Sequence, residues 1–265
     1  PAGQEVPASD VDALKYQGYV GSDITFMSPV TIAGVDYGPS LSNVQNALSP
    51  AFNANTQDVT LCLVGPSTST GFTVAPGEEL TPAALDALLD TLQAALPGKI
   101  TVVYDAGLSG SFLAGLTPPS GYEQKRLVVS STQPAQSAQF LKNGSISFSK
   151  FFWGRVLNGA TVYEAYSYAR AAMKFAGYGQ LAMLEDNGDG VGSTLNDGAV
   201  SRRYYIGTGV LLAGDDPIVG TTVGPKTITA TSSATIWVED VTTTSVLDRV
   251  YAVIAKPDGN ADTVE

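Results

Sequence analysis

The first part of the chain alternates between short apolar runs typical of strands and longer segments with helical spacing. Asp58–Gly65 (DVTLCLVG) is an apolar run bounded by Asp and Gly, which predicts a strand buried on both faces. Lys99–Asp105 (KITVVYD) and Lys125–Ser131 (KRLVVSS) predict two further strands. Asp23–Pro29 (DITFMSP) predicts a short strand that ends at its proline.

Four segments have the spacing of helices. Val11–Tyr16 is typical of a helix end that Gly18 stops, and Leu41–Phe52 places its apolar residues near one face. Thr81–Leu96 is the clearest, because Thr can cap, the following proline suits the first turn and leucines recur at helical spacing. Thr161–Phe175 begins with a Thr-x-x-Glu capping box. Strands and helices that alternate through short connections predict an α/β fold with a parallel sheet covered by helices.

The pattern changes near Asp215. The rest of the chain is rich in Thr, Val and Ile, alternates in ATIWVEDV and DRVYAVIAKP, and has no helical period, which predicts a β region. It is too short for a complete immunoglobulin-like sandwich, which needs roughly a hundred residues. We therefore divide the chain into an α/β domain, residues 1–214, and a small β-rich region, residues 215–265.

Charge and composition exclude several classes of function. The 265 residues include 14 Lys and Arg against 25 Asp and Glu, a net charge of -11, which opposes a nucleic-acid partner. No apolar run is long enough to cross a bilayer, so we expect no membrane span. Only 15% of the residues are charged and small polar residues are common, which suits an extracellular protein.

Two features of the composition limit the available chemistry. The single cysteine cannot form an intrachain disulfide. The chain has no histidine, which removes the usual general base, the commonest transition-metal ligand and the imidazole of any Ser/His or Cys/His pair.

Several segments resemble one enzyme family when they are taken in order. They are CLVGPS, YDAGLSGSF, RLVVSST, NGSISFSKFFWGRVLNGATVYEAYSYA, LEDNGDGVGSTLNDG and the tail ATIWVEDV. Together they resemble the legumain-type cysteine peptidases, relatives of caspases and gingipains, and especially the secreted bacterial members. The resemblance implies a caspase-like three-layer sandwich with a mainly parallel sheet, followed by a small immunoglobulin-like β region.

The chain departs from this family at both catalytic positions. In the family, one strand ends in a Gly-His-Gly-like turn that supplies the catalytic His, and the next parallel strand ends in Asp-Ala-Cys-x-Ser-Gly, which supplies the nucleophile. This chain has Pro66 where the pattern places His and Gly107 where it places Cys. A thiolate beside an imidazole is what the mechanism requires. We therefore expect a pseudopeptidase without enzyme activity, in which Pro66 and Gly107 mark the vestigial site.

Other groups near the expected cleft are candidates to replace the missing catalytic pair. Asp105, Ser109 and Ser131 belong to this region, and an unrelated hydrolase could use Asp105 as an acid or base. However, a serine nucleophile needs a base, serines in Gly/Ser-rich turns usually serve turn geometry, and an Asp at a strand end more often forms a turn. The only thiol, Cys62, falls inside a predicted strand and is expected to be a small buried hydrophobe.

The acidic segment LEDNGDGVGSTLNDG has features of a calcium loop. Glu185, Asn187 and Asp189 alternate, a glycine follows, and Asp197 lies one residue beyond the position of the usual bidentate ligand. Against calcium, the first ligand is Glu rather than Asp and the twelfth position is Asn196. The default interpretation is a solvated turn.

The resulting hypothesis is an inactive domain that acts as a structural, assembly or peptide-binding module of a secreted or cell-surface bacterial or archaeal protein. Its partner would be a protein or peptide, a neighbouring subunit or the remainder of a longer chain. The family pattern places a first core strand upstream of Val11–Tyr16, where only about ten residues lie. An unpaired sheet edge would then be open to a strand from another segment or subunit. The alternative is that the chain is a fragment of a longer protein.

Overall fold

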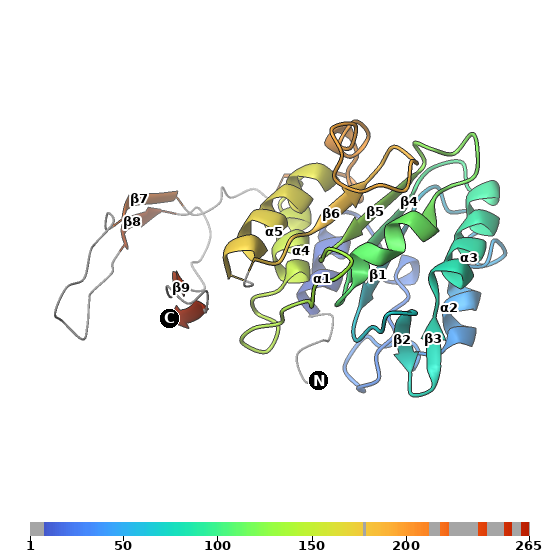
Figure 1. Cartoon of the computed structure of the whole chain (residues 1–265), viewed down its shortest axis with the longest axis horizontal. Coiled ribbons are helices and arrows are strands. Elements are labelled where there is room, and N and C mark those ends of the chain that lie inside the picture. Colours follow the sequence, from blue (N-terminus) through green and yellow to red (C-terminus); the bar gives the residue numbers. More distant parts are fainter. Residues whose placement is uncertain are drawn as a thin grey trace.

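The computed structural model describes residues 8–176 and 179–211, together with four strand segments at 218–222, 238–242, 252–255 and 261–264. The main body is built on a four-stranded sheet in the order β1-β4-β5-β6 (Figure 1). Its strands are β1 (Val59–Val64), β4 (Ile100–Asp105), β5 (Arg126–Ser130) and β6 (Met183–Glu185). The first three run parallel and β6 is antiparallel to β5. The predicted α/β fold with a mainly parallel sheet is therefore confirmed.

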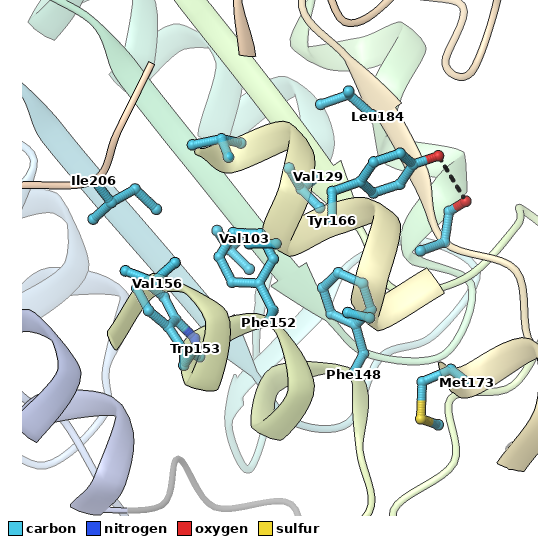
Figure 2. Close-up of a cluster of buried hydrophobic side chains, with 14 of the residues drawn as sticks. Val103, Val129, Phe148, Phe152, Trp153, Val156, Tyr166, Met173, Leu184 and Ile206 are labelled. Carbon is cyan, nitrogen blue, oxygen red and sulfur yellow. Dashed lines mark hydrogen bonds between the residues drawn. The ribbon is translucent and has the colours of Figure 1, made fainter. Parts of the chain in front are cut away.

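Helices cover both faces of this sheet. α1 (Ala8–Tyr16), α4 (Phe148–Leu157) and α5 (Val162–Ala176) lie on one face, and α2 (Leu41–Ala47) and α3 (Pro82–Ala95) lie on the other (Figure 1). Successive side chains of β4 point to opposite faces. Val103 packs into the cluster under α4 and α5, where Figure 2 shows it near Phe152, whereas Val102 and Tyr104 pack under α3. The sheet thus separates two apolar clusters.

The three parallel strands differ in burial. Every residue of β4 and β5 is buried, whereas only Leu63 is buried among the six residues of β1. The prediction that Asp58–Gly65 is buried on both faces is therefore wrong. The reason is that β1 is the last strand of the sheet, and within the described residues no strand pairs with its outer edge.

The helices begin where the capping residues predict. The Thr81 hydroxyl accepts a hydrogen bond from the backbone N–H of Ala84, at 3.2 Å, and Pro82 is the first residue of α3. Thr161 and Glu164 form the predicted reciprocal capping box of α5: the Glu164 N–H donates to the Thr161 hydroxyl, and the Thr161 N–H donates to the Glu164 carboxylate. Each contact satisfies a backbone N–H that has no partner within the helix.

Two local expectations need correction. Asp23–Pro29 does not form a strand; Met27 makes only an isolated bridge to Tyr37, because the neighbouring Phe26 N–H is taken by the Asp36 carboxylate at 2.8 Å. The helix expected over Leu41–Phe52 ends at Ala47, since the Ser-Pro pair that follows disfavours helical geometry. The hairpin of β2 (Phe72–Ala75) and β3 (Glu78–Leu80), and helix α4, were not foreseen.

The remaining elements are short. They are the 3-10 helices η1 (Gly21–Asp23), η2 (Ser109–Leu116) and η3 (Ser201–Arg203), and the strands β7 (Ile218–Thr222), β8 (Val238–Thr242), β9 (Ala252–Ala255) and β10 (Ala261–Val264). The last four form two antiparallel pairs within the region predicted to be β-rich. The immunoglobulin-like arrangement of residues 215–265 lies largely outside the described residues. None of the described helices is both long and apolar enough to cross a membrane.

Candidate functional site

The structure brings together the two turns that the sequence analysis singled out. β1 and β4 pair in parallel with Val64 opposite Asp105, so both strands end at the same edge of the sheet. Beyond the strands, the Gly65 N–H donates to the Asp105 carbonyl at 3.3 Å, and the Ser67 hydroxyl donates to the Gly107 carbonyl. Pro66 and Gly107 therefore lie in adjacent turns at the carboxyl ends of two parallel strands.

Gly107 is not required by the backbone at its position. Its φ is not in the left-handed region, and an added Cβ would meet Ala138 N and Ser137 Cα at 3.6 Å and Ser67 Oγ at 3.7 Å, which are ordinary contact distances. A Cβ at position 107 would therefore fit between the Ser67 turn and the loop after β5. The backbone at this position does not require glycine.

The residue after Gly107 has an unusual conformation that the sequence did not reveal. Leu108 has φ of 61°, in the left-handed region that non-glycine residues rarely adopt. The turn holds it through three hydrogen bonds: its N–H donates to the Gln136 carbonyl at 2.7 Å, and its carbonyl accepts from the Ser111 N–H at 2.9 Å and from the Ser111 hydroxyl at 2.7 Å. Backbone strain of this kind persists where surrounding contacts determine it, and it is common at ligand and catalytic turns.

Asp105 is fully buried and connects β4 to α4. Its Oδ2 accepts the backbone N–H of Ser149 at 2.9 Å and the Ser149 hydroxyl at 2.8 Å, so the carboxylate caps the first turn of α4. Its Oδ1 has no hydrogen-bond partner among the described residues. Burial raises the pKa of the Asp105 carboxyl, and the neighbouring Ser131 and Ser149 only partly oppose this. The position suits a structural link between two elements rather than an acid or base that meets a substrate.

The serines of the site hold the turns together. Ser109 is buried and exchanges hydrogen bonds with Thr132: its N–H donates to the Thr132 hydroxyl at 3.0 Å, and its hydroxyl accepts the Thr132 N–H at 3.2 Å. Ser131 is also buried, and its hydroxyl donates to the Ala106 carbonyl at 3.4 Å. These contacts fasten the turn after β4 to the end of β5. Asp105, Ser109 and Ser131 thus lie close together, beneath the surface rather than in an open cleft.

The carboxylates of the acidic loop accept hydrogen bonds from the loop's own backbone. The Glu185 Oε1 accepts the N–H groups of Asn187 and Asp189 at 3.0 and 3.2 Å. The Asp197 Oδ2 accepts the Thr194 N–H at 2.6 Å, and the Asp189 Oδ1 accepts the Val191 N–H at 2.7 Å. Burial raises the pKa of both Glu185 and Asp197. In the described residues, no group of three or more His, Cys, Asp or Glu side chains is placed to hold a metal ion.

Asp186, which the calcium pattern skipped, connects this loop to a later part of the chain. It is fully buried, and its two oxygens accept the N–H groups of Gly198, Val200 and Ser201 at 2.8, 3.1 and 2.8 Å. The carboxylate therefore fixes the return of the chain toward η3. A motif search for metal ligands cannot find such a residue, because its contacts are all made to backbone groups distant in sequence.

A groove runs along the outer edge of β1. Its volume is about 1210 Å³, and it extends from Asp58, before β1, to Pro66, after it. One side is lined by Val11 and Leu14 of α1, and the other by Val44 of α2. Of the residues named from the sequence, Cys62 and Pro66 line this groove, and the other candidate site residues do not. Cys62 is half-buried, whereas the sequence analysis expected it to be fully buried.

No protein-family model matches this chain, and no curated protein matches it.

Proposed function

We propose that this chain is a catalytically inactive, peptidase-like domain that acts as a structural or peptide-binding module of a secreted or cell-surface protein. The observation that carries the proposal is the pairing of two turns, at the ends of neighbouring parallel strands, that hold Pro66 and Gly107 where the resemblance to legumain-type peptidases expects His and Cys. The helices on both faces of a mainly parallel sheet support a caspase-like three-layer sandwich.

The chemistry of the neighbouring hydroxyls supports the loss of catalysis. The Ser67 hydroxyl donates to a backbone carbonyl, the Ser109 hydroxyl pairs with Thr132, and the Ser111 hydroxyl donates to the Leu108 carbonyl at 2.7 Å. A serine acts as a nucleophile only when a base accepts its proton, and none of these partners is a base. The chain also contains no histidine that could supply one.

A second candidate function, assembly through a strand donated by another chain, is favoured by the position of β1. It is an apolar strand with only one buried residue at the end of the sheet. Natural proteins usually cover or blunt such an edge, because its backbone can pair with another chain. The same edge gives a non-catalytic domain a means to bind a peptide without Cys or His.

The test of inactivity is an activity screen on the full chain. The protein is incubated with a library of fluorogenic peptides and simple esters and, separately, with a fluorophosphonate probe that labels activated serines. We expect neither turnover nor labelling. Turnover that Asp105→Asn abolishes would establish a hydrolase that uses Asp105, and labelling that Ser109→Ala or Ser111→Ala removes would establish a serine nucleophile; either result would overturn the proposal.

A further inference from the structure

The outer edge of β1 presents backbone hydrogen-bonding groups to the groove. The Val59 N–H donates to the Lys99 carbonyl at 2.9 Å and the Gly65 N–H to the Asp105 carbonyl at 3.3 Å, so the odd-numbered positions face β4. Backbone groups alternate in direction along a strand, and those of Thr60 and Val64 therefore face away from β4. This is the arrangement to which a further strand adds.

The walls of the groove are apolar on both sides of the sheet plane. On one side, Leu14 and Trp153 belong to or pack against the cluster under α1, α4 and α5. On the other side, Val44 and Leu48 belong to the cluster that α2 and α3 cover. A strand in the groove would bury both of its faces. Such strands are mostly apolar instead of alternating with polar residues.

One end of the groove is acidic. Asp23 and Asp58 both line it, and no Lys or Arg is among its lining residues. The two carboxylates lie near the Tyr19 hydroxyl, whose pKa is raised first by burial and then by Asp58 and Asp23. Since Asp58 directly precedes β1, the acidic end is the end at which β1 begins. A cationic residue beside the apolar run of an incoming strand would find complementary charge there.

We propose that the groove beside β1 binds an extended segment of another polypeptide, which pairs with the edge of β1 as a fifth strand of the sheet. The segment has about six successive apolar, β-branched residues, spans about 20 Å and carries a Lys or Arg next to the end that lies by Asp23 and Asp58. This inference rests on the binding role proposed above and names its partner class. It is independent of the loss of catalysis, which the activity screen tests separately.

The test uses the full chain and synthetic peptides with a central run of about six Val and Ile residues and a Lys at each end. Binding is followed by calorimetry, and the strand addition by amide hydrogen exchange with NMR detection. We expect the backbone N–H groups of Thr60 and Val64 to become at least tenfold slower to exchange when peptide is added. Those of Leu61 and Leu63, which already face β4, should change little.

Two controls separate strand pairing from simple burial of apolar side chains. A peptide that is N-methylated at alternate residues cannot donate hydrogen bonds along one of its two edges. Two such peptides are made, one methylated at the odd and one at the even positions. One of them should lose at least tenfold in affinity, and the other should bind as before. In the protein, Phe52→Asp places a charge in the groove and should weaken binding about tenfold, whereas Phe175→Asp on α5 should not. Phe52 and Phe175 are 58% and 63% exposed, so neither substitution threatens the fold.

Three results would overturn the proposal. One is the absence of binding by every peptide. A second is binding that leaves the exchange of Thr60 and Val64 unchanged or that tolerates both N-methylated peptides. The third is slow exchange of the Thr60 and Val64 N–H groups before any peptide is added. If the protein is a monomer in solution, this result would mean that the chain itself fills the groove. If the protein is a dimer, it would mean that a second copy fills it.

Discussion

Substitution of Asp105 tests whether its carboxylate has a structural or a catalytic role. Its Oδ2 accepts two hydrogen bonds from Ser149 at the start of α4. A typical hydrogen bond contributes about 0.5–1.5 kcal/mol, and removal of the acceptor would leave the buried Ser149 donors without a partner, at a cost of about 1–3 kcal/mol. Burial of the carboxyl, whose Oδ1 has no hydrogen-bond partner among the described residues, offsets part of this. We therefore expect Asp105→Ala to lower the free energy of unfolding by about 2–4 kcal/mol. Asp105→Asn keeps an oxygen that can accept both bonds, so it should lose much less.

The pH dependence gives this prediction a sign. Burial raises the pKa of Asp105 in the folded state. The contribution of Asp105 to the free energy of unfolding is therefore complete below the ordinary aspartate pKa. It is lost as the pH rises toward the raised pKa, because the unfolded chain loses this proton first. Asn cannot ionise. Asp105→Asn should therefore gain stability relative to the wild type as the pH rises from about 4 to 7.

Urea denaturation of the wild type and Asp105→Asn, at several pH values over this range, measures the difference directly. The other carboxylates are common to both proteins and cancel in the comparison. If Asp105→Asn instead loses stability relative to the wild type as the pH rises, the folded protein favours the ionised carboxylate, and the argument from burial is wrong.

Four further changes test particular contacts. In urea denaturation, Gly107→Ala should lower the free energy of unfolding by less than about 0.5 kcal/mol. Gly110→Ala should lower it by more than about 2 kcal/mol, because the new Cβ at position 110 would lie 2.5 Å from the Thr132 carbonyl oxygen. Equal losses for the two variants would contradict the described turn. Thr161→Ala should cost about 1 kcal/mol through loss of the α5 capping box, and no change would show that this cap is dispensable. Millimolar calcium should not shift the thermal midpoint, because Glu185 Oε1 and Asp197 Oδ2 already accept backbone N–H groups of the loop; a rise that chelator reverses would establish a calcium site.

The elements that the sequence predicted correctly are those with strong local signals. α3 and α5 carry both an apolar face and a capping residue, and β4 and β5 are short apolar runs. In contrast, α4 was not predicted, although its buried residues Phe148, Phe152 and Val156 recur at helical spacing. The aromatic run Phe151–Trp153 breaks the simple alternation of apolar and polar positions. Asp23–Pro29 resembles a strand locally, but among the described residues it forms only the isolated bridge between Met27 and Tyr37.

The candidate site was predictable in its position and not in its contacts. Parallel strands end at one edge of a sheet, which is why Pro66 and Gly107 could be placed together from the sequence. The burial of Asp105 and Ser109 depends on Ser149 and Thr132, which are distant in sequence and give no local signal. For the same reason, the incomplete burial of β1 could not be predicted from its composition, which is that of a central strand.

The central claim is that the turns at Pro66 and Gly107 form a catalytic site from which the catalytic side chains are missing. The most direct measurement is the rate of iodoacetamide alkylation at pH 6.5 in a Cys62→Ala background, for Gly107→Cys alone and together with Pro66→His. A cationic imidazole beside a thiol lowers its pKa and raises the thiolate fraction. We predict that the introduced thiol reacts about tenfold faster in the combined variant. Equal rates would show that positions 66 and 107 do not face each other, and would contradict the account.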